Sequence, residues 1–138
     1  MIKLFISQSA RDKSNEKLFA ERNNIIVKAS EQFEEAVEVL DSYFKDYVPK
    51  SGCIHLKFLS KALETIADAD ILVLGEDWEF ERECRLELNA AIYYDIPIYR
   101  IDQGELIKVR DFVPVMRRKY TFALQGHRPR FRTCQQKN

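Results

Sequence analysis

Four short apolar runs alternate with helix-like segments along the first 101 residues, and this alternation is the strongest constraint on the fold. The runs cover residues 2–7, 36–40, 69–75 and 96–101. The third run reads ADILVLG and is nearly all apolar, as expected for a strand that is buried on both faces. Between the runs, apolar residues recur at helical spacing over residues 15–33, around residues 59–66 and over residues 80–94. Repeated alternation of strand and helix predicts an α/β fold with helices on both faces of a parallel sheet.

We expect a flavodoxin-like three-layer sandwich in which the parallel sheet has the strand order 2-1-3-4-5. Ser14 is the predicted N-cap of the first helix, with Glu16 in its first turn. Residues 1–104 form the predicted α/β domain. Residues 105–138 add a strand over 105–109 and a basic tail, either within the same domain or packed on a neighbouring subunit.

Charge is distributed unevenly along the 138 residues, a length that fits one domain. The 22 Lys and Arg residues balance the 22 Asp and Glu residues, but Asp111 is the last acid and seven of the cations lie beyond it. A tail of charge +7 against a body of −7 predicts that the tail folds back, docks on a second copy or meets an anion. We expect a homo-oligomer with tail exchange, in which the tail aromatics Tyr120, Phe122 and Phe131 bury apolar area. The overall charge balance makes nucleic acid an unlikely partner.

The cysteine pattern and the absence of long apolar runs predict the cellular compartment. Cys53, Cys84 and Cys134 are odd in number and widely spaced, which argues against a disulfide scaffold or a zinc site and favours a reducing cytosol. No apolar run approaches the roughly 18 residues of a membrane span, and no signal-peptide cleavage site follows the first strand. We therefore expect a cytoplasmic protein with no membrane contact and no metal.

Ligands of open α/β sheets bind beyond the carboxyl ends of the strands, which directs attention to residues 7–13, 41–47 and 75–84. The first of these loops has hydroxyl, amide and guanidinium groups ahead of a helix N-terminus, where ribose hydroxyls or a phosphate bind well. It contains no glycine and is therefore not a P-loop. An ordinary polar loop is the alternative interpretation. The candidate substrate-binding residues are Ser7, Gln8, Ser9 and Arg11 in the first loop, Asp41 in the second and Trp78 in the third.

Glu87 is the sharpest candidate for chemistry. On a helical wheel it lies beside Ala90, Ala91 and Tyr94, on the apolar side of its helix. Burial raises the pKa of a carboxyl group, whereas a helix N-terminus lowers it and keeps the anion available as a nucleophile. A structural glutamate that pairs with an arginine or caps the helix would show the same pattern.

The segment before Glu87 is crowded with acids. Asp77 and Glu81 are candidates for proton transfer, because paired carboxylates divide nucleophile and acid/base roles in glycosyl chemistry. Solvated acids in a first helical turn are the alternative. Trp78, the only tryptophan, would stack on a base or cover the core.

Several segments, in order, resemble the nucleoside 2-deoxyribosyltransferase-like superfamily, in particular its short branch found in bacteria and their phages. The segment Glu87-Leu88-Asn89-Ala90-Ala91 is similar to a Glu-Leu-Gly-x-Ala segment of characterised members, whose glutamate attacks the anomeric carbon and holds the sugar as an ester. The resemblance therefore implies that Glu87 is a nucleophile. The tail segment His127–Phe131 is similar to a segment that completes a neighbouring subunit's active site, which implies a binding role for Arg130. The main similar segments are residues 2–8, 14–16, 37–44, 59–64, 67–70 and 75–97.

The resemblance implies an enzyme that acts on the N-glycosidic bond of a nucleoside or nucleotide, as a deoxyribosyltransferase or hydrolase, through a glycosyl-Glu87 intermediate and without a cofactor. Asp77 or Glu81 would assist the departing base and Trp78 would stack on it. The chain differs from the family pattern where the base-handling aspartate falls near Ala62, and glycines of the short branch are replaced near Asp12 and at Glu83. These differences favour an alternative, a protein that binds or sequesters a nucleotide without turnover.

A second resemblance points to another N-glycosidic reaction. The segments over residues 5–12 and 84–88 are similar to the first box and the Cys-x-x-Glu-Leu helix of TIR domains, some of which cleave NAD with that glutamate. A TIR-like NAD glycohydrolase is therefore a further alternative. In both resemblances the bond that is cleaved lies beside Glu87.

Overall fold

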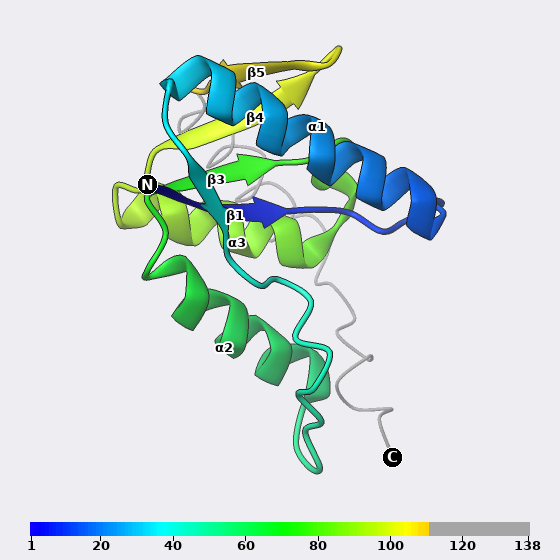
Figure 1. Ribbon diagram of the computed structural model, residues 1–138. Helices are drawn as coiled ribbons and strands as arrows, with labels where there is room; N and C mark the ends of the chain where they lie inside the picture. Colours follow the sequence, from blue (N-terminus) through cyan, green and yellow to red (C-terminus); the bar gives the residue numbers. More distant parts are fainter. Residues whose placement is uncertain (111–138) are drawn as a thin grey trace, which may run out of the picture.

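The computed structural model describes residues 1–110 (Figure 1). Five strands and three α-helices, with one short 3-10 helix, follow one another along the chain. They are β1 (Ile2–Ser7), α1 (Asn15–Phe33), β2 (Val37–Val39), α2 (Ile54–Ile66), β3 (Ile71–Leu74), η1 (Trp78–Phe80), α3 (Arg82–Tyr93), β4 (Ile98–Asp102) and β5 (Glu105–Lys108).

The strands form one sheet of order β2-β1-β3-β4-β5, which confirms an α/β fold with the predicted strand order. The first four strands are parallel, with β1 paired to both β2 and β3 and β3 paired to β4. This is the order of flavodoxin-like sheets, in which ligands bind where the order reverses, here between β1 and β3. The carboxyl ends of β1 and β3 point to the same edge of the sheet (Figure 1).

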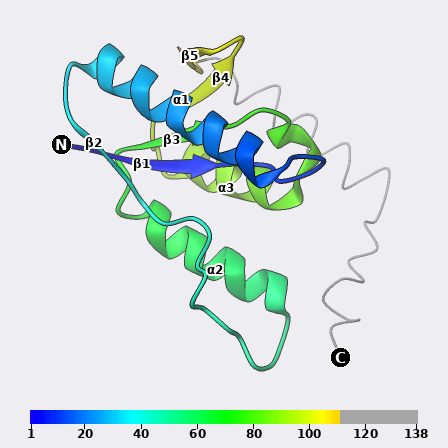
Figure 2. The same ribbon diagram turned by 45° about the vertical axis from the view of Figure 1, so that its right-hand side comes forward.

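The helices bury their apolar sides on opposite faces of the sheet. On one face, Ile25 and Ala29 of α1 pack in a cluster with Leu4 and Ile6 of β1. On the other face, α2 and α3 pack in a second cluster with β1 and β3, through Ala62, Ile66, Leu88, Ala91, Phe5, Leu72 and Leu74. Both views show α1 on the opposite side of the sheet from α2 and α3 (Figures 1 and 2).

Local signals explain the bounds of α1. Ser14 has an extended backbone, and its side chain accepts a hydrogen bond from the Lys17 N–H, which confirms the predicted cap. The helix ends at Phe33, because Glu34 takes a left-handed conformation with φ of 51°. The predicted range 15–33 is the observed one.

The last strand departs from the expectation of a parallel sheet. β5 pairs with β4 in antiparallel orientation, with Asp102 opposite Glu105. Only Gln103 and Gly104 connect the two strands, and both have positive φ, as the two-residue turns that favour hairpins require. A parallel connection would need a crossover of about a dozen residues or more, which this short link excludes.

Some predictions fall on residues 111–138, outside the described residues. They are the tail exchange between subunits and the binding role of Arg130, and both stay predictions. Within residues 1–110, no helix combines the length and the apolar character that crossing a membrane requires.

Candidate functional site

The three loops singled out from the sequence meet at a cavity of about 230 Å³ at the carboxyl edge of the sheet. Its wall combines polar side chains from these loops with apolar side chains from α2. The described lining residues are Ile6, Gln8, Ala10, Ser42, Tyr43, Phe44, Phe58, Leu59, Ala62, Glu81, Glu83, Cys84 and Glu87. Glu87 thus lies on the wall of a cavity, at the switch point between β1 and β3.

Glu87 is nearly buried, with 8% of its surface exposed, and only one of its oxygens has a protein partner among the described residues. The Ser7 hydroxyl, at the end of β1, donates to Glu87 Oε1 at 2.6 Å. The Cys84 thiol also interacts with the Ser7 side chain, which lowers the pKa of the thiol. Ser7 thus fixes Oε1 of Glu87, and Oε2 has no hydrogen-bond partner among the described residues.

Burial controls the protonation of both groups that contact Ser7. Burial raises the pKa of Glu87 to about 7, and repulsion from Glu83 raises it too, against the lowering effect of the Ser7 hydrogen bond. Burial also raises the pKa of Cys84 to about 12, so Cys84 remains a neutral thiol at physiological pH. Glu87 therefore changes charge near neutrality.

Glu81 is the second carboxylate on the cavity wall that a serine holds. The fully buried Ser9 donates from its hydroxyl to Glu81 Oε1 at 3.2 Å and accepts from the Arg11 backbone N–H. The Arg11 side chain is exposed, and its guanidinium reaches the Phe80 carbonyl at 3.5 Å, a long contact. Ser9 therefore positions Glu81, and Arg11 lies outside the cavity lining.

Gln8 and Asp41 fix the aromatic side of the cavity. The Gln8 side chain donates to the Leu18 carbonyl and accepts from the Tyr43 hydroxyl at 3.0 Å. Asp41 Oδ1 accepts from the backbone N–H groups of Tyr43 and Phe44, which supports the left-handed conformation of Phe44. Asp41 thus acts through the loop, whereas Gln8 itself lines the cavity.

A buried ion pair holds the loops before α1 and after β3 together. Lys13 Nζ lies 3.0 Å from Glu21 Oε2, and their side chains are 1% and 7% exposed. Lys13 also donates to the Glu76 carbonyl, and Glu21 accepts from the Glu76 N–H. A Cβ on Gly75 would lie 2.2 Å from Glu21 Oε1, so the glycine gives Glu21 the space to reach this loop.

The wall that α2 contributes was not predicted from the sequence. Phe58, Leu59 and Ala62 line the cavity, and the position near which the resemblance places a base-handling aspartate is the buried Ala62. Ser60 and Glu64, its nearest polar neighbours, are exposed. The apolar spacing in this helix predicts a packed face, but not that part of this face borders a cavity.

Two further candidates lie outside the cavity lining. Asp77 has a left-handed conformation with φ of 64°, precedes η1 and is exposed. Trp78 is half-buried and packs against the core cluster beneath α2 and α3. Of the interpretations open for Trp78, its packing matches a residue that covers the core.

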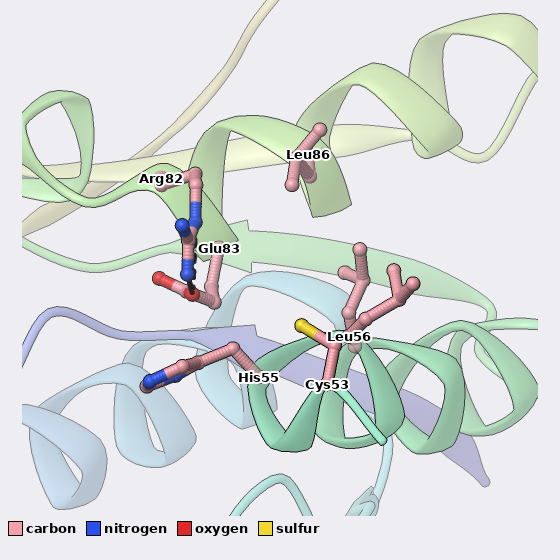
Figure 3. Close-up of a pocket in the computed structure, with 7 residues that line it drawn as sticks. Cys53, His55, Leu56, Arg82, Glu83 and Leu86 are labelled. Carbon is pink, nitrogen blue, oxygen red and sulfur yellow. Dashed lines mark hydrogen bonds and ion pairs between the residues drawn. The ribbon is translucent and has the colours of Figure 1, made fainter. Parts of the chain in front are cut away.

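A second cavity, of about 350 Å³, adjoins the first, and the two share Leu59 and Glu83. Residues at the start of α2 face residues of α3 across it, and Arg82 is bonded to Glu83 at its side (Figure 3). The remaining lining is Cys53, His55, Leu56 and Leu86. This space is therefore apolar, apart from His55 and a carboxylate that an arginine neutralises.

The arrangement suits attack by a carboxylate on a small ligand. The lining combines a buried carboxylate that has a free oxygen, two further carboxylates and a tyrosine with aromatic and aliphatic side chains. Within residues 1–110, no three His, Cys, Asp or Glu side chains are grouped to hold a metal ion.

Comparison of the chain with models of protein families, with curated proteins and with solved structures finds no significant match.

Proposed function

We propose that this chain acts on the N-glycosidic bond of a nucleoside or nucleotide, as an N-glycoside hydrolase or a 2-deoxyribosyltransferase, with Glu87 as the nucleophile. The observation that carries the proposal is the state of Glu87. It is buried on the wall of a cavity, Ser7 fixes one oxygen, and the other oxygen has no partner among the described residues. A carboxylate held in this way needs no cofactor to attack a sugar carbon.

The chemistry would follow the double displacement of retaining glycosidases. Glu87 Oε2 bonds to the anomeric carbon while the bond from that carbon to the base nitrogen breaks. The electron pair of that bond leaves with the base. Water or a second base then displaces Glu87 from the ester, which gives hydrolysis or transfer. Glu81 lines the same cavity as Glu87, whereas Asp77 does not. Glu81 is therefore the better candidate to give a proton to the departing base or to take one from the attacking water.

The shape and polarity of the cavity also support a nucleoside. About 230 Å³ is slightly below the usual range for ligand pockets, roughly 300–1,000 Å³, which suits a small ligand. Phe44 and Phe58 provide an aromatic wall, whereas Gln8 and Tyr43 provide polar groups. The proposal includes a flavodoxin-like three-layer sandwich, in which helices on both faces leave the carboxyl edge open for this ligand.

Release or exchange of base tests the proposal. The full chain is incubated with ribonucleosides, deoxynucleosides, their monophosphates and NAD, and free base is measured by chromatography. We expect the wild type to release base from at least one nucleoside and Glu87→Ala to be inactive. Glu31→Ala, which removes an exposed carboxylate from α1, is the matched control and should remain active. Base release by Glu87→Ala at the wild-type rate would exclude the covalent mechanism.

One observation favours a second candidate function, binding of a nucleotide without turnover. The cavity wall has Ala62 near the position where the resemblance implies an aspartate that handles the base. Calorimetry separates the two functions, because tight binding without product after long incubation indicates sequestration. NAD stays in the panel as the test of the TIR-like alternative. A diphosphate of NAD that entered the adjoining cavity would meet a mostly apolar lining, in which Arg82 is already paired to Glu83.

A further inference from the structure

The charge of the cavity lining is one-sided. Its 13 described residues include three carboxylates, Glu81, Glu83 and Glu87, and no lysine, arginine or histidine. A ligand in this space therefore meets carboxylates and aromatic side chains, among them Phe44 and Phe58. Both features attract cations, because an aromatic ring presents its negative face to a positive group.

Two arginines contact residues of this lining, and within residues 1–110 neither is paired with Glu81 or Glu87. Arg82 donates to Glu83 at 2.7 Å, which neutralises the Glu83 carboxylate. Arg22 donates to the Ser42 hydroxyl and lies over the Tyr43 ring, 4.9 Å from its centroid. Among the ion pairs of residues 1–110, none involves Glu81 or Glu87.

Glu81 and Glu87 each accept a side-chain hydrogen bond. A serine hydroxyl donates to each of them, Ser9 to Glu81 and Ser7 to Glu87. A donor stabilises a carboxylate relative to the protonated acid, although burial opposes this effect for Glu87. The site therefore provides acceptors to a ligand, and its lining has Ala62 near the position where the resemblance implies an aspartate that handles the base.

Resting on the proposed function, we infer that the cavity selects nucleosides whose base is already cationic, such as an N-alkylated purine or a pyridinium, over neutral nucleosides and over nucleotides whose phosphate would enter the cavity. For such a substrate the chemical balance needs no acid. The Glu87–carbon bond forms, the carbon–nitrogen bond breaks, and its electron pair neutralises the ring, so that the base leaves uncharged. Water then adds to the anomeric carbon, Glu87 leaves as a carboxylate, and the proton of the water passes to Glu81 or to solvent.

Two ligands of nearly the same shape test the selectivity directly. Nicotinamide riboside has a cationic ring, and its 1,4-dihydro form has a neutral one. Binding is measured by calorimetry at pH 7.5 on the full-length Glu87→Gln variant, which cannot form the ester. We expect the charged riboside to bind at least tenfold more tightly. This preference should disappear in the Glu81→Gln/Glu87→Gln double variant and persist when Glu79→Gln, an exposed change on η1, replaces Glu81→Gln.

Each outcome decides the inference. Equal or weaker binding of the charged riboside, or a preference that survives the loss of Glu81, overturns it. A turnover assay on the wild type separates this failure from failure of the proposed function. Release of base from guanosine but not from 7-methylguanosine overturns the selectivity and leaves glycosidic chemistry intact. Release neither from the panel nor from 7-methylguanosine and nicotinamide riboside overturns both. Thermal melts of all variants confirm that they are folded.

Discussion

Glu21 and Glu87 are both nearly buried, but they have opposite surroundings. Glu21, on α1, lies 3.0 Å from the Lys13 ammonium group and accepts a backbone N–H from Glu76. Glu87, on α3, has no cation among the described residues and accepts one hydroxyl proton, from Ser7. Glu21 connects two loops, whereas Glu87 borders a cavity.

The difference indicates which buried carboxylate is structural. A buried charge is tolerated when a partner and hydrogen bonds replace the water that it loses. Glu21 has such replacements. Burial without a paired cation raises the pKa of Glu87 to about 7, and its second oxygen has no hydrogen-bond partner among the described residues. Strongly perturbed groups in clefts are candidates for function, which is the reason to assign chemistry to Glu87.

The largest expected effect comes from breaking the Lys13–Glu21 pair. We expect Lys13→Met to lower the free energy of unfolding by about 3–5 kcal/mol, because it leaves Glu21 buried without a cation. Urea unfolding at pH 7 measures this loss. Lys17→Met, an exposed change in α1, is the control and should alter stability by less than about 0.5 kcal/mol. A loss below about 1 kcal/mol for Lys13→Met would contradict the structural role of this pair.

Glu87→Gln should instead raise the free energy of unfolding, by an amount that depends on pH. The folded state holds the Glu87 proton with a pKa of about 7, against an ordinary value of 4.5, so the wild type loses stability as pH rises through this window. Since one pKa unit corresponds to about 1.4 kcal/mol, the loss is about 3 kcal/mol at pH 8.

The glutamine variant has no such proton to lose. It should match the wild type near pH 4.5 and exceed its stability by up to about 3 kcal/mol at pH 8, as measured by urea unfolding at both pH values. An equal stability difference at both pH values would show that Glu87 does not titrate in this window.

Ser7→Ala tests the hydroxyl that partly replaces a cation beside Glu87. Loss of this donor raises the pKa of Glu87 further, because the hydrogen bond lowers it in the wild type. At pH 8 we expect a loss of stability of about 1.5–3 kcal/mol, the usual contribution of a hydrogen bond to a charged group. The rising limb of the pH–rate profile for base release should also move to higher pH. An unchanged profile would separate Ser7 from the reactive carboxylate.

Gly75→Ala should have the smallest effect on stability, and it tests the space that the Glu21 carboxylate occupies. Its Cβ would displace Glu21 Oε1, at an expected cost of about 1–3 kcal/mol, the range seen when buried space is overfilled. In a Glu21→Ala background the same substitution should cost much less, which a double-mutant cycle in urea measures. Additive losses of stability would mean that Gly75 does not provide the space that the Glu21 side chain occupies.

The sequence predicts the early part of the fold well and its end less well. The bounds of β1 and α1 follow from a continuous apolar run and from Ser14, which are local signals. The direction of β5 depends on the positive φ of Gln103 and Gly104, and the expected range 105–109 did not include this turn. Local sequence signals therefore predict where the helices and strands lie. The orientation of the last strand depends instead on the positive φ of the two residues that connect it to β4.

The site was predicted in part, for a similar reason. The helical wheel places Glu87 on a packed face, and strand order brings the three loops to one edge. The roles of Ser9 and Asp41, which hold Glu81 and the loop of Tyr43, depend on side-chain contacts that no sequence pattern shows. The pair Lys13–Glu21 escaped prediction because it joins an ordinary polar loop to an ordinary amphipathic helix.

The most direct test of the account is the mass of the protein after reaction. The wild type and Glu87→Gln are mixed with a nucleoside from the panel or with its 2-fluoro analogue, which slows breakdown of the ester, and are then quenched in acid. We predict that the wild type gains the mass of one glycosyl group, located by peptide mass spectrometry on Glu87, and that Glu87→Gln gains none. A glycosyl group on another residue, or base release by the wild type with no adduct at any time, would contradict the assignment of Glu87 as the nucleophile.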